Sequence, residues 1–206
     1  MNISEYKKIN KLNYFEYCDY LKNKYGNVTG DYYFPNFKRN FKISRTTDGL
    51  VVHHIKENVA ILLSREDCAR QNPYEYQKAH NLVYADFLEH LLLHILICEE
   101  NKDMKVKIPV GIQGILIFQI PELNDIYSGY MPEYPWQKHL YDKVINDKKV
   151  YLELVKRFKH NCNNYPLYDK YEKYMYTSLN ARNNRNWDNK NDQKILKKLK
   201  KYNLSH

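Results

Sequence analysis

The sequence lacks the cysteine pattern of a metal ribbon or a disulfide-stabilised domain. It holds four cysteines in 206 residues, and no two of them form a C-x-x-C pair. Cysteines so far apart argue against a zinc ribbon, a thioredoxin-type redox site and a dense disulfide framework. Reduced thiols and a cytoplasmic location are the simplest prediction.

The sequence also lacks a long apolar run. No uninterrupted stretch approaches the ~20 residues that a membrane helix needs, and residues 1–11 are polar with mixed charge. We therefore expect neither secretion nor membrane spanning. The 43% of hydrophobic and 15% of aromatic residues suffice for a packed core, so disorder of the whole chain is excluded. The length fits one domain of ordinary size.

Charge is distributed unevenly along the chain. The formal net charge is +9, with −5 over residues 48–104 and +6 over residues 181–206. Basic flanks around an acidic centre suit a protein that holds a polyanion at its edges and carries out metal or acid–base chemistry in the middle. Enrichment in lysine, asparagine and tyrosine is also typical of an AT-rich genome, so charge alone does not decide the function.

The central region predicts two short strands followed by a buried helix. A β-branched run over residues 50–55 follows the Asp48-Gly49 turn signal, and residues 82–84 form a second apolar run. Asp86 and Glu89 have the spacing of a capping box at the start of a helix over residues 87–99. That helix is apolar on nearly all sides, which indicates burial.

Helices are expected in the flanks as well. The apolar spacing predicts one helix over residues 5–25, one from Pro109 to a stop at Pro121, and one over residues 136–158. Residues 193–202 are rich in lysine and carry a narrow apolar stripe. We divide the chain into four segments: 1–47 (helix and basic, aromatic connector), 48–104 (core with the two strands and the buried helix), 105–180 (helical part) and 181–206 (basic tail).

Five polar residues occur in an order that indicates a possible metal-binding site. His53 and His54 end the first strand, Asn81 opens the second, and His90 and His94 lie on the helix. Residues four apart on a helix have Cβ atoms ~6 Å apart, so the last two imidazoles can bind one metal ion together. Neighbours on a strand point to opposite faces, so only one of the first two histidines can face that metal.

This pattern resembles the HNH branch of the His-Me finger (ββα-metal) nucleases, and within it the colicin-type arrangement. The resemblance covers residues 48–98, roughly a quarter of the chain, and includes the Val52-His53-His54-Ile55, Asn81-Leu82-Val83-Tyr84 and 89–94 motifs. The chain departs from the compact members in one respect, because 26 residues separate His54 from Asn81.

The resemblance implies an α+β fold with a ββα-metal core embedded in a mainly helical single domain. It implies that His53, His90 and His94 bind one divalent metal ion, that His54 is the general base, and that Asn81 braces the loop or orients His54. The products would carry 5′-phosphate and 3′-hydroxyl ends. Three neutral imidazoles favour zinc, nickel, cobalt or manganese over magnesium, although related sites also use magnesium, so the metal stays open.

The function that we predict is a site-specific DNA endonuclease of the restriction or phage and mobile-element kind. Its partner would be double-stranded DNA, with a homodimer as one possible assembly and no membrane. Candidate contacts to DNA are the basic residues of two segments. These are Lys38, Arg39, Lys42, Arg45, Arg182, Arg185, Lys197 and Lys198.

Two other functions compete with this one. A structural zinc ββα module in a non-catalytic DNA-binding protein would need a fourth ligand that closes the metal shell, whereas a catalytic site keeps an open position and an extra imidazole beside it. The second competing function is that of an RNase or a non-specific toxin nuclease. Lys56, Glu57 and Arg65 lie near the histidine pair. They could contact phosphate or the metal ligands, but the sequence favours surface charges for all three.

Overall fold

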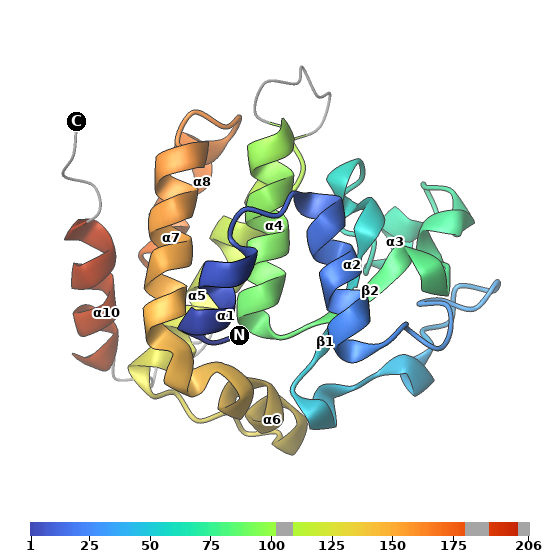
Figure 1. The fold of residues 1–206 in the computed structure, drawn as a ribbon, viewed down its shortest axis with the longest axis horizontal. Helices are drawn as coiled ribbons and strands as arrows, with labels where there is room; N and C mark the ends of the chain where they lie inside the picture. The colour runs from blue at the N-terminus through green and yellow to red at the C-terminus, as the bar shows by residue number, and fades with distance from the viewer. Residues whose placement is uncertain (102–108, 180–189, 202–206) are drawn as a thin grey trace.

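The computed structural model describes residues 1–101, 109–179 and 190–201 (Figure 1). It is mostly helical with one small antiparallel sheet, which agrees with the predicted α+β class. The helices are α1 (Ile3–Ile9), α2 (Tyr14–Tyr25), α3 (Glu66–Ala69), α4 (Phe87–Asn101), α5 (Ile120–Ser128), α6 (Pro135–Val144), α7 (Lys148–Cys162), α8 (Tyr168–Met175) and α10 (Lys190–Lys201). Within these ranges, every helix is too short or too polar to cross a bilayer.

The two predicted strands are present and pair with each other. Strand β1 (Val51–His54) runs antiparallel to β2 (Leu82–Ala85), and His53 pairs with Val83 while His54 pairs with Leu82. Residues 55–81 connect them through short helical turns and α3. A pair of strands this short is not stable alone, and here α2 and α4 pack against it.

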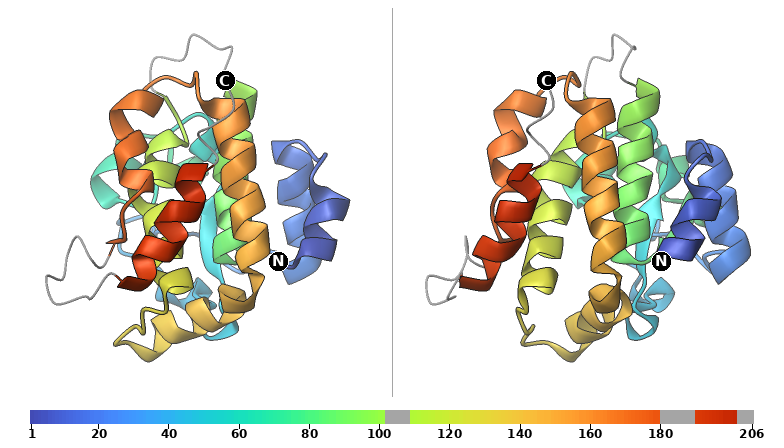
Figure 2. Two further views of the ribbon diagram at one scale, coloured as in Figure 1. Left: turned by 90° about the vertical axis from the view of Figure 1, so that its left-hand side faces the viewer. Right: turned by 60° about the vertical axis from the view of Figure 1, so that its left-hand side comes forward.

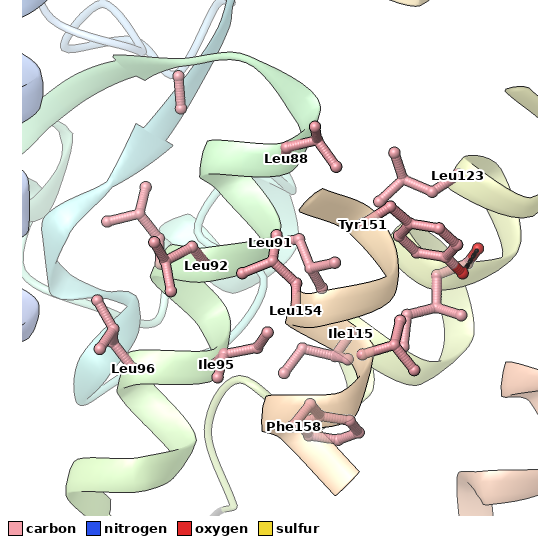
Figure 3. Packing of buried hydrophobic residues seen from close by; sticks show 14 of the residues in the cluster. Leu88, Leu91, Leu92, Ile95, Leu96, Ile115, Leu123, Tyr151, Leu154 and Phe158 are labelled. Atoms are coloured by element: carbon pink, nitrogen blue, oxygen red, sulfur yellow. Dashed lines mark hydrogen bonds between the residues drawn. The ribbon is translucent and has the colours of Figure 1, made fainter. Parts of the chain in front are cut away.

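Helix α4 follows β2 at once and forms the centre of the core. Its predicted capping box is present: Asp86 Oδ1 accepts from the Glu89 amide and Glu89 Oε2 accepts from the Asp86 amide, both at 2.8 Å. In the right-hand view of Figure 2, α4 lies between α7 on one side and α2 on the other. Figure 3 shows its leucines in the core with Leu154 and Phe158 of α7. This packing fixes which face of α4 turns toward the sheet.

Two predicted helices are each divided in two. The expected helix over residues 5–25 breaks before Asn13, because Asn13 and Glu16 form a capping box that begins α2. The expected helix over residues 136–158 breaks at the turn Ile145–Asp147, which separates α6 from α7. In both places a local polar contact or turn interrupts an apolar spacing that would otherwise read as continuous.

The helix expected between Pro109 and Pro121 has different bounds. A π-helical segment covers Gly114–Gln119, and α5 then continues through Pro121 to Ser128. Proline is tolerated in the first turn of a helix, where its missing amide hydrogen has no helical partner to lose. Pro121 therefore lies at the start of a helix and does not end one.

The lysine-rich helix α10 packs on α5. Its Ile195 and Leu199 are buried in the main core, while Lys197 and Lys198 are exposed. The predicted amphipathic stripe is thus a packing surface. Arg182 and Arg185 lie outside the described residues.

Candidate metal centre

Four side chains converge where β1 meets α4. His53 comes from β1, Glu57 from the turn Ile55–Asn58 that follows it, and His90 and His94 from α4. Each offers one ligand atom, and these atoms all lie within 4.8 Å of one another. The group could hold a metal ion, and we refer to it as the metal group. Helical spacing predicted the pair His90 and His94, and the resemblance implied His53 as the third imidazole.

Glu57 is the member that the sequence did not predict. Its Oε2 lies 3.3 Å from His94 Nε2 and 3.6 Å from His53 Nδ1, and its side chain is only 13% exposed. The interpretation of Glu57 as a surface charge is wrong, because the turn after β1 folds its carboxylate back among the imidazoles. The available signal was its position four residues after His53.

A hydrogen bond from α2 sets the tautomer of His53. The Tyr14 hydroxyl donates to the Ile55 carbonyl at 2.8 Å, so it can only accept from His53 Nε2, which lies 2.9 Å away. His53 Nδ1 therefore carries the lone pair. That atom is buried and has no hydrogen-bond partner among the described residues. An orphaned buried nitrogen that faces a carboxylate and two imidazoles fits a metal ligand.

The protonation of the group also suits a cation. Burial lowers the pKa of His53 well below its usual value and that of His90 to about 3. Both imidazoles are therefore neutral near pH 7 and have lone pairs to offer. Burial opposes ionisation of Glu57, yet the imidazoles that face it, His94 above all, hold the pKa of its carboxyl below the usual value. One carboxylate and neutral imidazoles are the donor set of zinc and similar transition metals.

We expect Tyr14→Phe to weaken metal binding about 10- to 100-fold, the usual effect of losing a hydrogen bond that orients a ligand histidine. Titration calorimetry with zinc would measure it. The matched control is Tyr17→Phe, because Tyr17 is also buried on α2 but its hydroxyl has no hydrogen bond to the metal group. Equal zinc affinity in the two variants would contradict a role for Tyr14 in orienting His53.

His54 faces a different set of partners. Its Nε2 lies 3.0 Å from Gln77 Oε1, and Gln77 Nε2 donates to the Leu63 carbonyl at 3.3 Å, which fixes the orientation of the amide. His54 therefore carries its proton on Nε2 and its lone pair on Nδ1. Burial, opposed in part by Glu57 and Gln77, lowers the pKa of this imidazole. A neutral imidazole held in one tautomer is suited to accept a proton.

Asn81 braces the loop that carries Gln77. Its Nδ2 donates to the Glu75 carbonyl at 2.8 Å, within the turn Tyr74–Gln77. Bracing was one of the two roles that the resemblance implied. The other role, contact with His54, is filled in the described structure by Gln77. Tyr32 completes the surroundings of His54, with ring centroids 4.3 Å apart.

All five histidine and glutamate side chains discussed above line one cavity of about 440 Å³. The opposite wall comes from the π-helical segment and α5, with Phe118, Gln119 and Glu122 among its residues. The volume lies within the range of small-molecule sites, about 300–1,000 Å³. The metal group and His54 therefore share a space that a ligand can enter.

Comparison with known proteins does not assign the chain to a family. No family model, no curated protein and no solved structure matches the chain. The chemistry must be argued from the side chains themselves. Those side chains offer a cation site with one carboxylate and three imidazoles, and a separate imidazole beside it.

The basic residues of segment 38–45 that were predicted to contact DNA differ in exposure and in their contacts within the protein. Lys38 and Lys42 are exposed. Arg39 instead stacks over the Tyr32 ring and donates to its carbonyl, at 3.1 Å. Arg45 bonds Asp48 and the Tyr25 carbonyl, each at 2.7 Å. The two arginines therefore stabilise the conformation of this segment, whereas the side chains of the two lysines are exposed to solvent.

Proposed function

We propose that this protein is a metal-dependent DNA endonuclease of the HNH type. The observation that carries the proposal is the combination of the metal group with His54, a non-ligand imidazole that lines the same cavity and whose tautomer leaves Nδ1 with its lone pair. Phosphodiester hydrolysis needs a general base for water and positive charge near the phosphate. The cavity offers the residues for both.

Each residue has a part in this mechanism. His53, His90 and His94 would hold the divalent ion, and a bound ion supplies stabilisation of the charge that grows on the leaving 3′ oxygen. His54 Nδ1 accepts the proton of the attacking water while Gln77 holds the opposite nitrogen. Tyr14 keeps His53 in the tautomer that a ligand needs. The products would be 5′-phosphate and 3′-hydroxyl ends.

Incubation of the purified protein with plasmid DNA and magnesium, manganese, nickel or zinc tests the proposal. We expect metal-dependent cleavage, and sequencing of the ends would show recurrent sites if the enzyme is site-specific, as we propose for a restriction or mobile-element nuclease. Absence of cleavage with all four metals, by a chain that binds metal and DNA, would contradict the nuclease function.

Glu57 favours a second candidate function, a structural zinc site in a DNA-binding protein. A fourth protein ligand closes a tetrahedral shell, and closed shells are typical of structural zinc. The separate imidazole of His54 and the adjoining cavity favour catalysis instead. The two functions predict different outcomes when Glu57 loses its charge.

We expect Glu57→Gln to weaken metal binding but to leave cleavage at saturating metal within about tenfold of the unchanged chain, because the phosphate can replace this ligand. Rates would be measured over a metal titration. The control is Glu66→Gln, an exposed carboxylate that pairs with Arg70. If the unchanged chain cuts no DNA and Glu57→Gln alone abolishes zinc-dependent thermal stability, the site is structural.

The exposed lysines of α10 should contact DNA phosphates. We expect Lys197→Glu with Lys198→Glu to reduce the slope of log affinity against log salt by about 0.9 for each lost phosphate contact, without changing the cleavage sites. Filter binding over a salt series would measure it. Charge reversal is a cleaner test than removal of residues 181–206, because removal would also uncover the surface of α5 that Ile195 and Leu199 cover.

The matched control is Lys7→Glu with Lys8→Glu, an equal change of charge at exposed residues of α1. If both double variants change the slope equally, net charge and not a local contact explains the effect. An unchanged slope in the α10 variant would make this helix a packing element with a solvated face.

A further inference from the structure

The metal group lies inside the molecule and not on its surface. His53 is 1% exposed and His94 6%, and access to them is through the 440 Å³ cavity. The cavity has the size of a small-molecule site, about 300–1,000 Å³, which suits one nucleotide and not a paired duplex.

The wall opposite the metal group has the chemistry of a base-binding surface. Phe118 lines the cavity and is 48% exposed, so it lies where the cavity meets solvent. Aromatic side chains in this position stack on unpaired bases of any sequence. Ile61, Leu62 and Phe87 add further apolar lining.

Polar groups without partners lie on the same lining. Gln113 and Glu122 line the cavity, and neither side chain has a hydrogen bond or ion pair with another described residue. Burial, with a smaller contribution from Asp125, raises the pKa of Glu122 to about 7. Its carboxyl is therefore partly protonated near neutral pH, and it can donate as well as accept a hydrogen bond. The amide of Gln113 and the carboxyl of Glu122 can therefore form hydrogen bonds with the donors and acceptors on the edge of a nucleobase.

We propose that this cavity takes one unpaired nucleotide of the DNA substrate, with its phosphate at the metal group, its base against Phe118 and its polar edge toward Gln113 and Glu122. The inference rests on the proposed nuclease function and narrows its substrate to DNA in which a nucleotide is single-stranded, bulged or extruded from the duplex. Extrusion has an unstacking cost that is smallest where a base is already unpaired. Stacking on Phe118 offsets part of that cost.

The test compares the affinity for two duplexes that differ only by one bulged nucleotide, in the His54→Ala variant loaded with zinc. This variant prevents cleavage during the measurement, so the result does not depend on activity. We expect the bulged duplex to bind about tenfold more tightly, as one stacked base would allow. Phe118→Ala in the same background should remove that preference, and Phe118→Trp should keep it. Fluorescence anisotropy at fixed salt would measure all six affinities, those of the three variants for each of the two duplexes.

Trp136→Ala is the matched control, because Trp136 is also 48% exposed and does not line the cavity. It should leave the preference unchanged. Equal affinity for the two duplexes, or a preference that survives Phe118→Ala, would overturn the inference even if the unchanged chain cuts paired plasmid DNA. If instead the preference follows Phe118 but no metal supports cleavage of bulged or paired DNA, the nucleotide site stands and the nuclease function fails.

Discussion

Replacement of His54 by alanine should lower the rate of DNA cleavage about 100- to 10,000-fold, the usual effect of losing a general base. Metal and DNA binding should stay close to those of the unchanged chain, because His54 is not in the metal group. Single-turnover cleavage at saturating metal would measure the chemical step alone. A rate close to that of the unchanged chain would show that the base has been wrongly assigned.

Gln77 supplies a second test of the same assignment. Gln77→Met removes the acceptor that holds His54 Nε2, and cleavage should slow without loss of metal affinity. Gln77→Glu keeps an acceptor at that position and should retain more activity. Nitrogen chemical shifts of His54 would report its tautomer directly. The control His160→Ala alters an exposed histidine of α7 and should change neither rate nor tautomer.

Loss of an imidazole from α4 should have the largest effect on metal binding. We expect His90→Ala and His94→Ala each to weaken zinc affinity by more than the ~10- to 100-fold that follows from an outer-shell change. Zinc should then stabilise the fold less, because binding free energy adds to the free energy of unfolding. Calorimetry for affinity, and thermal unfolding with and without zinc, would measure both effects.

Leu96→Ala separates metal binding from packing in this experiment. Leu96 is buried on the same helix and offers no ligand atom, so its replacement should lower thermal stability while zinc affinity stays the same. Unchanged zinc affinity in both histidine variants would mean that these side chains serve only to pack the core.

Local patterns predicted the parts of the site that are close in sequence. The β-branched run and the turn before it predicted β1, and the Asp86 and Glu89 spacing predicted the start of α4. Helical periodicity placed His90 and His94 on one face. These features depend on residues a few positions apart, so the sequence shows them directly.

Element bounds were less well predicted in the flanks. The apolar spacing of residues 5–25 continues through Asn13, yet the side chain of Asn13 bonds the amide of Glu16 and begins a new helix. Pro121 was expected to stop a helix and instead lies in the first turn of α5. In each case a polar cap or a proline is compatible with two local structures, and packing against neighbouring helices selects one.

The sequence by itself determined the strand–strand–helix order, the histidines on β1 and α4, and the lysine-rich segment with its narrow apolar stripe. Only the tertiary structure decided that Tyr14 bonds His53 across 39 positions and that Gln77 bonds His54 across 23. It also decided that Glu57 turns inward among the imidazoles. The physical reason is that a hydrogen bond between distant residues leaves no periodic trace in the chain. It forms only once α2, the connecting loop and the sheet are packed together.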